Sequence, residues 1–146
     1  MLKEICQFIL DHCATSLHFV LGENFFAGHL PMKNMLGAEV PTRVMVILER
    51  VPSAVNGQLP DYVDKVIQIW NRNDNYFEAR QDAQDIYDCL HGFTGHVLMI
   101  SSVDQYYALV IDAMATPAPI ANPNEKGEFE FSTNYLFRIE GEPPTP

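Results

Sequence analysis

The segment from residue 128 to residue 140 alternates between two kinds of side chain. Its odd positions are mostly apolar: Phe129, Phe131, Thr133, Tyr135, Phe137 and Ile139. Its even positions are polar except for Leu136: Glu128, Glu130, Ser132, Asn134, Arg138 and Glu140. Because successive side chains of a strand point to opposite faces, this pattern predicts a long strand with one buried and one solvated face.

A proline-rich arm, residues 115–127, leads into this strand. Pro117, Pro119 and Pro123 have no backbone N–H to donate to a neighbouring strand, and they bias the residues before them to extended conformations. We therefore expect the arm to stand off the body of the protein. Loops of more than about twelve residues without secondary structure are usually functional or disordered, so we interpret the arm as a contact element for other proteins.

The charge of the chain limits the partners that it can have. It contains 9 Lys and Arg residues against 19 Asp and Glu residues, a formal net charge of −10. A protein that binds nucleic acid by itself needs a basic surface, so the composition argues against that class. No apolar run is long enough to predict a membrane span. Charged residues interrupt the N-terminal segment where a signal peptide would need an apolar run, so we expect a cytoplasmic protein.

Two segments have the spacing of amphipathic helices. Residues 2–20 place apolar side chains three or four positions apart, and residues 76–91 do the same. A glycine follows each helix closely and is expected to end it. Asn75 is predicted to accept hydrogen bonds at the start of the second helix, while the side chain of Glu78 reaches back toward it.

Four further segments have the composition of strands: residues 42–51, 62–71, 96–103 and 106–114. A short extended piece is expected within residues 24–31. Asn56-Gly57 is a strong turn signal, but the segment around it is interpreted as too long for a two-residue hairpin.

The order of these elements predicts an α+β fold. We expect a two-layer sandwich, with a mainly antiparallel sheet of about five strands and both helices on one face. The 146 residues, 47% of them hydrophobic, suit a single domain, which we place at residues 1–140. Loops 52–60 and 115–127 are predicted to project from it, and residues 141–146 to form a flexible tail.

The three cysteines, Cys6, Cys13 and Cys89, are too few and of the wrong parity for a disulfide framework. Cys6 and Cys13 fall on the same face of the first predicted helix. The sequence therefore predicts buried, reduced thiols, since a free cysteine packs as a small apolar residue.

The five histidines are His12, His18, His29, His91 and His96. His12 and His18 lie on different sides of a helix and cannot share a metal ion. His91 and His96 flank a turn, but no cysteine or second carboxylate stands at ligand spacing. We interpret these histidines as surface or turn residues.

The sequence contains no catalytic signature. Asp82, Asp85 and Asp88 are interpreted as a solvated stripe of the second helix, because paired catalytic carboxylates need burial to separate their pKa values. Nucleophile, phosphate-binding and dinucleotide-binding motifs are missing. We therefore predict no catalytic residue, no metal ligand and no cofactor.

Two local patterns stand beside the order of the elements. In residues 66–80 a strand runs through an asparagine-rich turn into a helix. In residues 119–135 the arm, with Asn124 and Gly127, runs into the alternating strand. Together with the element order, which covers most of residues 1–140, these patterns resemble the tail terminator proteins of long-tailed bacteriophages, also labelled tail-to-head joining, minor capsid or tail completion proteins.

The resemblance implies a non-enzymatic virion protein that is assembled in the bacterial cytoplasm. It implies a ring, expected to be a hexamer, that caps the tail tube and joins it to the head. The implied partners are other copies of the chain, the tail tube protein and a head-completion or connector protein, while DNA passes through the ring without sequence-specific binding and no membrane is involved. The two projecting loops are expected to reach neighbouring subunits through the residues Val55, Asn56, Gly57, Gln58, Pro119, Asn122, Asn124, Glu125 and Lys126.

Two other functions remain open from the sequence. One is a two-layer α+β module that dimerises through an edge strand and binds a small ligand. The other is a small hydrolase that uses His91, His96 and an aspartate. A stable dimer that retains a small molecule favours the first, and loss of a measurable activity on substitution of both histidines favours the second.

Overall fold

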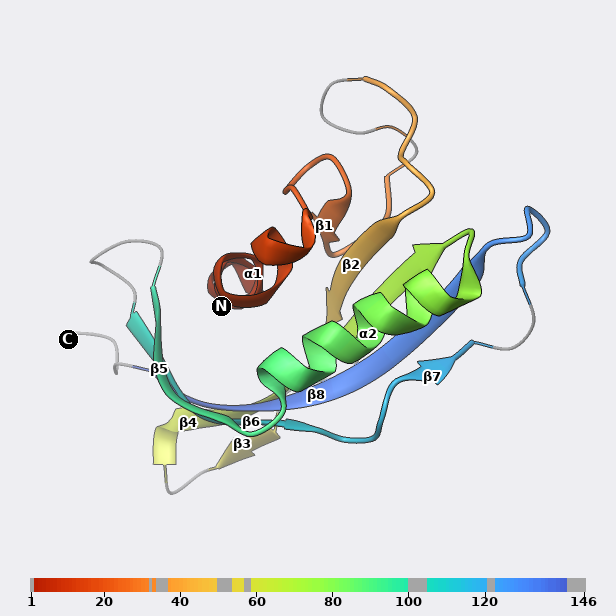
Figure 1. The fold of residues 1–146 in the computed structure, drawn as a ribbon. Coiled ribbons are helices and arrows are strands. Elements are labelled where there is room, and N and C mark those ends of the chain that lie inside the picture. The colour runs from red at the N-terminus through yellow and green to blue at the C-terminus, as the bar shows by residue number, and fades with distance from the viewer. Residues whose placement is uncertain are drawn as a thin grey trace.

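One twisted sheet runs through the protein, and two helices pack against the same face of it (Figure 1). The computed structural model describes residues 2–31, 33, 37–49, 54–56, 59–99, 105–120 and 123–141. The helices are α1 (Leu2–Ile9), which continues as a π-helix (Leu10–Ala14) and a 3-10 turn (Thr15–Leu17), and α2 (Tyr76–Leu90). The strands are β1 (Phe25–Ala27), β2 (Val44–Glu49), β3 (Ala54–Asn56), β4 (Leu59–Asn73), β5 (Phe93–Met99), β6 (Gln105–Ala113), β7 (Ala118–Pro119) and β8 (Phe129–Gly141).

The predicted α+β class and the mainly antiparallel sheet are confirmed. The main path of the sheet runs β1-β2-β4-β8-β6-β5, while β3 pairs with β4 and β7 pairs with β8. Only β1 and β2 run parallel among the described pairs. The sheet has 8 strands, more than the expected number of about five. The additional strands β1, β3 and β7 have three residues or fewer, which is too short for alternation to show in sequence.

The alternation in β8 has the predicted consequence. Phe131, Tyr135 and Phe137 are buried on the helix side of the sheet. The main core joins Tyr135 and Phe137 to Ile9 of α1 and Ile86 of α2, whereas Phe131 packs with Ala79 and Ala83 of α2 in a separate cluster. The opposite face carries the polar side chains of β8, and neither of the two described helices lies over it (Figure 1). The long β4–β8 pairing, from Tyr62 opposite Glu140 to Asn73 opposite Phe129, holds this register.

The first helix differs from the prediction of one regular helix over residues 2–20. It is α-helical only over Leu2–Ile9. It continues first as the wider π-helix and then as the tighter 3-10 turn. His18 follows with a φ of 65°, in the left-handed region, and ends the helical path before Gly22. The apolar period still buries Ile5, Ile9 and Cys13, so the sequence predicted the buried side of this segment but not its pitch.

The start of α2 agrees with the prediction in one respect and differs in another. The side chain of Asn75 accepts hydrogen bonds from the N–H groups of Phe77 at 3.0 Å and Glu78 at 3.2 Å, as an N-cap does. The predicted return contact from Glu78 is wrong. Its carboxylate accepts a hydrogen bond from the side chain of Asn73, which also accepts the N–H of Asn75. In a capping box, Glu78 would accept the backbone N–H of Asn75. Here the side chain of buried Asn73 accepts it.

The segment around residue 57 also differs from the prediction. β3 and β4 pair on both sides of positions 57 and 58, with Val55 opposite Val63 and Asn56 opposite Leu59. The two strands thus form the short-loop hairpin that sequence analysis rejected, because β4 begins at Leu59 and not at residue 62. Gly57 and Gln58 themselves lie outside the described residues.

The proline-rich arm also differs from the prediction, because part of it pairs with the sheet. Ala118 lies opposite Ser132 and Pro119 opposite Phe131, and the N–H of Ile120 donates to the carbonyl of Glu130 at 2.8 Å. Successive N–H groups of an extended chain point in opposite directions, so the nitrogen of Pro119 faces away from β8, where no donor is needed. The prolines therefore suit an outer edge strand and do not hold the arm away from its own subunit.

The prediction that all three cysteines are reduced is wrong. Cys13 and Cys89 form a disulfide that spans 76 residues of sequence, while Cys6 is a buried free thiol. The odd number of cysteines excludes a framework that uses all three, but it leaves a single bridge possible. The disulfide ties the π-helix after α1 to the last turn of α2, so the two helices on the sheet are joined covalently.

Candidate assembly surface

The aspartates of α2 do not form a solvated stripe throughout. Asp82 is buried and binds the guanidinium of Arg43 through two hydrogen bonds of 2.9 Å. The Asp85 and Asp88 side chains instead accept hydrogen bonds from Gln81 and Gln84 on the same helix. Asp82 therefore has a structural partner, and the three carboxylates do not converge on a common point.

His91, one of the two histidines in the hydrolase interpretation, makes structural contacts. Its Nδ1 accepts the N–H of Ala113 at 3.0 Å, and its ring stacks on that of Tyr87 with centroids 5.1 Å apart. The side chain of His96 lies outside the described residues. Within the described ranges, no three His, Cys, Asp or Glu side chains are placed to hold a metal ion. His91 is thus a turn residue, as the sequence indicated.

An aromatic patch, defined here as Tyr76 and Phe77, lies at the first turn of α2. The ring of Tyr76 packs on Phe129 and on Phe131, with centroids 5.5 Å apart in each case. The rings of Phe77 and Tyr76 are in edge-on contact, with centroids 5.5 Å apart. Phe77 is otherwise solvated, with 78% of its surface exposed. Because Tyr76 and Phe77 are both exposed and adjacent, they form a candidate contact surface.

The groups around the aromatic patch are polar and mostly acidic. Asp74 and Glu78 are exposed on either side of it in the sequence, and Arg80 follows one turn along the helix. The patch is held in place from beneath, because Asn75 caps the helix and Asn71 donates to the carbonyl of Ala79 at 2.9 Å. The position of Phe77 is therefore fixed by contacts that the protein already makes.

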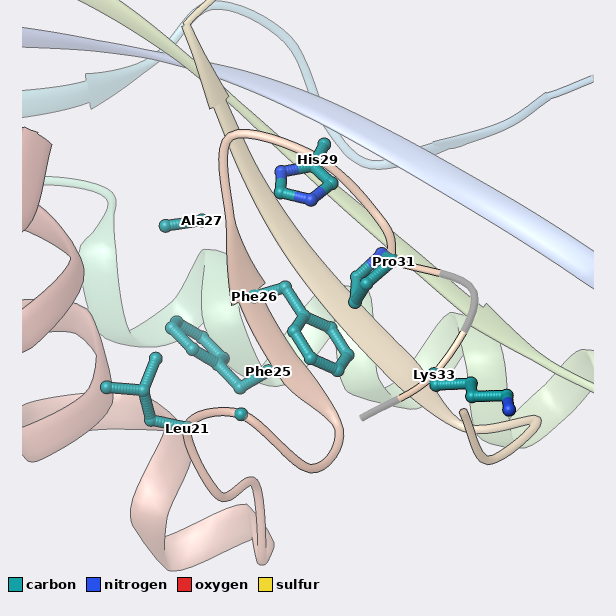
Figure 2. A pocket seen from close by; sticks show the side chains of 8 residues that line it. Leu21, Phe25, Phe26, Ala27, His29, Pro31 and Lys33 are labelled. Atoms are coloured by element: carbon teal, nitrogen blue, oxygen red, sulfur yellow. The ribbon is translucent and has the colours of Figure 1, made fainter. Parts of the chain in front are cut away.

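A hollow of about 280 Å³ lies beside β1, at the end of the sheet. We call it the β1 hollow, and it is lined by Leu21, Gly22, Phe25, Phe26, Ala27, His29, Pro31 and Lys33. Figure 2 shows the two phenylalanine rings between Leu21 on one side and Pro31 and Lys33 on the other. A second hollow of about 250 Å³, between β1 and α1, shares Leu21 and Ala27 with it. The two hollows are neighbours, and Leu21, half exposed, stands between them.

The β1 hollow exists because β1 is a short strand at the sheet end. β1 pairs only with β2 on the main path, and its other side meets the turn at Leu21 and Gly22, where the N–H of Gly22 donates to the carbonyl of Phe25. Phe25 packs into the main core on one face of the sheet, whereas Phe26 packs with Val44 and Val46 on the other. Both rings are buried, and the exposed surface at this edge comes from Leu21, Ala27 and His29.

The residues predicted for subunit contact fall into two separate places. Val55 and Asn56 belong to β3, whereas Pro119, Glu125 and Lys126 are exposed near the start of β8. Since β4 and β8 are antiparallel, these two sets lie at opposite ends of the long strand pair (Figure 1). Gly57, Gln58 and Asn122 lie outside the described residues.

Asn124, from the same set, has an internal role. Its side-chain oxygen accepts the N–H groups of Lys126 and Glu128, and its amide donates to the Glu128 carboxylate at 3.1 Å. Glu128 is buried and pairs with Arg72 at 3.2 Å. Asn124 therefore shapes the turn that presents Glu125 and Lys126.

With this geometry described, comparison with known proteins decides the family. Residues 20–140 match the family described as "Bacteriophage tail terminator protein". The chain belongs to the bacteriophage tail terminator family. It is a structural protein of a phage tail, which confirms the resemblance inferred from its sequence and gives no support to the hydrolase interpretation.

Among solved structures, the chain is similar in fold to one chain of a structure described as "Virion of native gene transfer agent (GTA) particle". The TM-score is 0.54 at 16% sequence identity, with 80% of this chain and 78% of that chain covered. At this identity the likeness shows the fold alone. The comparison with curated proteins found no match. No helix in the described part of this tail terminator chain is long and apolar enough to cross a membrane.

Sequence analysis missed both the aromatic patch and the β1 hollow as contact candidates. The exposure of Phe77 could have been predicted from the sequence. Phe77 falls on the charged side of the amphipathic helix α2, which faces away from the core. The hollow gives no such signal. Its lining comes from a turn, a three-residue strand and the segment after it, none of which is periodic.

Proposed function

We propose that this tail terminator protein forms a ring that ends the tail tube and joins it to the head. The observation that carries the proposal is the family match, which extends over residues 20–140. The proposed ring is a hexamer of single-domain subunits, located in the virion and assembled in the host cytoplasm. Its partners are its own copies, the tail tube protein, and a head-completion or connector protein.

The described surface supports self-association. The aromatic patch and the β1 hollow are both apolar and exposed, and they lie on different parts of the subunit (Figures 1 and 2). Surfaces that differ from each other and bind head to tail generate closed rings when the rotation between subunits closes. We also propose residues of the two loop regions as subunit contacts: Val55 and Asn56 of β3, the exposed residues Pro119, Glu125 and Lys126, and also Gly57, Gln58 and Asn122.

The charge of the chain suits a ring through which DNA passes. Each subunit has a net charge of −10, and three of its cations, Arg43, Lys65 and Arg72, are already paired with carboxylates. A channel lined by such subunits repels the phosphate backbone, so DNA moves through it without being held.

Negative-stain electron microscopy of the purified protein, alone and mixed with tail tubes, tests this function. We expect rings at high subunit concentration, or one ring at the end of each tube. Native mass spectrometry then gives the number of subunits in the ring.

A protein that stays monomeric at every concentration and binds no tube end contradicts the proposal. A stable dimer that retains a small molecule through gel filtration supports instead the ligand-binding module. The β1 hollow, at about 280 Å³, is at the lower limit of the size of typical ligand pockets.

A further inference from the structure

We propose that Phe77 of one subunit inserts into the β1 hollow of the next subunit. The inference rests on the proposed function, because it names the contact that closes the ring. Its elements are an aromatic side chain with 78% of its surface exposed and an open apolar hollow, both on one chain.

Phe77 has the properties of an anchor residue. Its side chain is 78% exposed, so a partner can cover nearly all of it. It sits on the first turn of a capped helix and beside Tyr76, which packs on Phe129 and Phe131. Little backbone freedom is therefore lost on binding. Rigid, exposed aromatic residues that enter a pocket supply most of the binding energy in many interfaces.

The β1 hollow has the size and the lining for a phenyl ring. An apolar cavity of about 150 Å³ accommodates benzene, and this hollow measures about 280 Å³. Leu21, Ala27 and Pro31 provide aliphatic walls, and the buried rings of Phe25 and Phe26 lie beneath them. An incoming aromatic ring packs mainly against these aliphatic side chains, with the slightly exposed ring of Phe26 available for an edge contact.

The charged side chains that line the hollows and the carboxylates beside Phe77 are of opposite sign, although Glu39 lies opposite Lys33 and Arg80 follows Phe77 on α2. Asp74 and Glu78 flank Phe77. The lining of the two neighbouring hollows includes Lys33 and Lys3, together with His29, and no carboxylate. Neither lysine belongs to the ion pairs found between described residues. In a chain of net charge −10, where copies repel each other overall, this pairing orients two subunits with unlike surfaces in contact.

The placement of the two surfaces makes the contact directional. The β1 hollow lies at the outer edge of β1, whereas Phe77 lies where α2 begins, beside the start of β8. A subunit that gives its Phe77 to one neighbour still offers its hollow to another. The contact is therefore heterologous, and it continues from subunit to subunit until the ring closes.

Two single variants test this contact by complementation. Phe77→Asp removes the anchor, and Ala27→Trp fills the hollow, since Ala27 lines both hollows and its side chain is exposed. Each variant alone is expected to raise the subunit concentration needed for ring formation at least about tenfold. At concentrations where neither variant forms rings alone, the mixed variants are expected to form 1:1 dimers, because only one intact contact between Phe77 and the hollow remains between them.

Met114→Asp is the matched control. Met114 is 61% exposed and lies after β6, outside both surfaces, so this variant is expected to form rings like the unaltered protein. Circular dichroism melting curves check that every variant is folded. Lys33→Glu provides a second variant of the hollow with no change in its volume, and it is expected to weaken assembly more at low salt than at high salt.

A photo-reactive benzoylphenylalanine at position 77 identifies the partner directly. Cross-linked peptides from residues 21–33 of another copy support the inference, and peptides from any other region or from the tail tube protein overturn it. Rings that form unchanged from Phe77→Asp also overturn it, while leaving the proposed function intact. If the unaltered protein forms no ring with or without tubes, both proposals fail.

Discussion

Arg43 and Asp82 are joined by two hydrogen bonds of 2.9 Å, although they are 39 residues apart in the sequence. The same guanidinium donates to the carbonyl of Leu17 at 2.8 Å and lies over the ring of Phe19 at 4.0 Å from its centroid. One side chain therefore connects the segment after the first helix, the start of β2 and the middle of α2. This arrangement holds α2, and with it Phe77, in position over the sheet.

Asp82→Asn is expected to lower the free energy of unfolding by about 2 kcal/mol, because it leaves the partly buried charge of Arg43 without its counter-ion. Arg43 keeps about a third of its side chain in solvent, which limits the loss. Urea denaturation measures the change. Asp85→Asn, on the same helix and bonded only to Gln81 among the described contacts, is the control and should change stability little. Equal effects of the two substitutions contradict this account of Arg43.

The disulfide predicts a thiol count. Without reductant, the protein unfolded in concentrated guanidinium chloride should show a single reactive thiol, that of Cys6, and with reductant all three cysteines should react. Reduction, or Cys13→Ser with Cys89→Ser, should cost about 2–4 kcal/mol of stability because a long loop in the unfolded chain is released. Peptide mapping by mass spectrometry identifies the bridge. A bridge that involves Cys6 contradicts the pairing.

Stability should fall at alkaline pH. Burial, with a smaller contribution from the charge of Glu49, raises the pKa of the Cys6 thiol from 9.0 to about 12, and burial also raises the pKa of the Tyr135 hydroxyl. The unfolded chain therefore loses the thiol proton from about pH 9 upward while the folded protein keeps it, so the stability present below pH 9 is lost as the pH rises toward 12.

For Cys6 alone the expected loss is on the order of 1–2 kcal/mol between pH 8 and pH 10.5, measured by urea denaturation. Cys6→Ala should make the pH dependence shallower. An unchanged slope in this variant would show that the thiol ionises equally in both states.

Asn124→Ala should lower stability by about 1–2 kcal/mol, since three side-chain hydrogen bonds that hold the turn before β8 are lost. Lys126→Ala, on the same turn but exposed, should leave stability unchanged. Thermal melting compares the two. If Lys126→Ala impairs ring assembly while its melting temperature stays the same, the predicted role of this residue in subunit contact gains support; if Asn124→Ala melts like the unaltered protein, the internal role described for Asn124 is wrong.

The sequence predicted the elements that have a regular pattern of apolar and polar side chains or a local capping residue. The alternation of β8 and the cap of α2 at Asn75 are local patterns, and both are found in the structure. The short strands β3 and β7 were missed, because three residues or fewer contain no period to detect, whereas β1 lies within the short extended piece expected at residues 24–31. Prolines in the arm were interpreted as a reason to stand apart, whereas the structure uses Pro119 where an edge strand needs no donor.

The sequence by itself determined the class of fold, the buried sides of its long strand and helices, and the resemblance to tail terminator proteins, because each of these depends on residues that are close together along the chain. The tertiary structure alone decided that Cys13 meets Cys89, that Asp82 is buried against Arg43, and that a turn and a short strand enclose the β1 hollow. These features join segments that are distant in sequence. Their contacts are set by the packing of helices on a sheet, which no local pattern of side chains records.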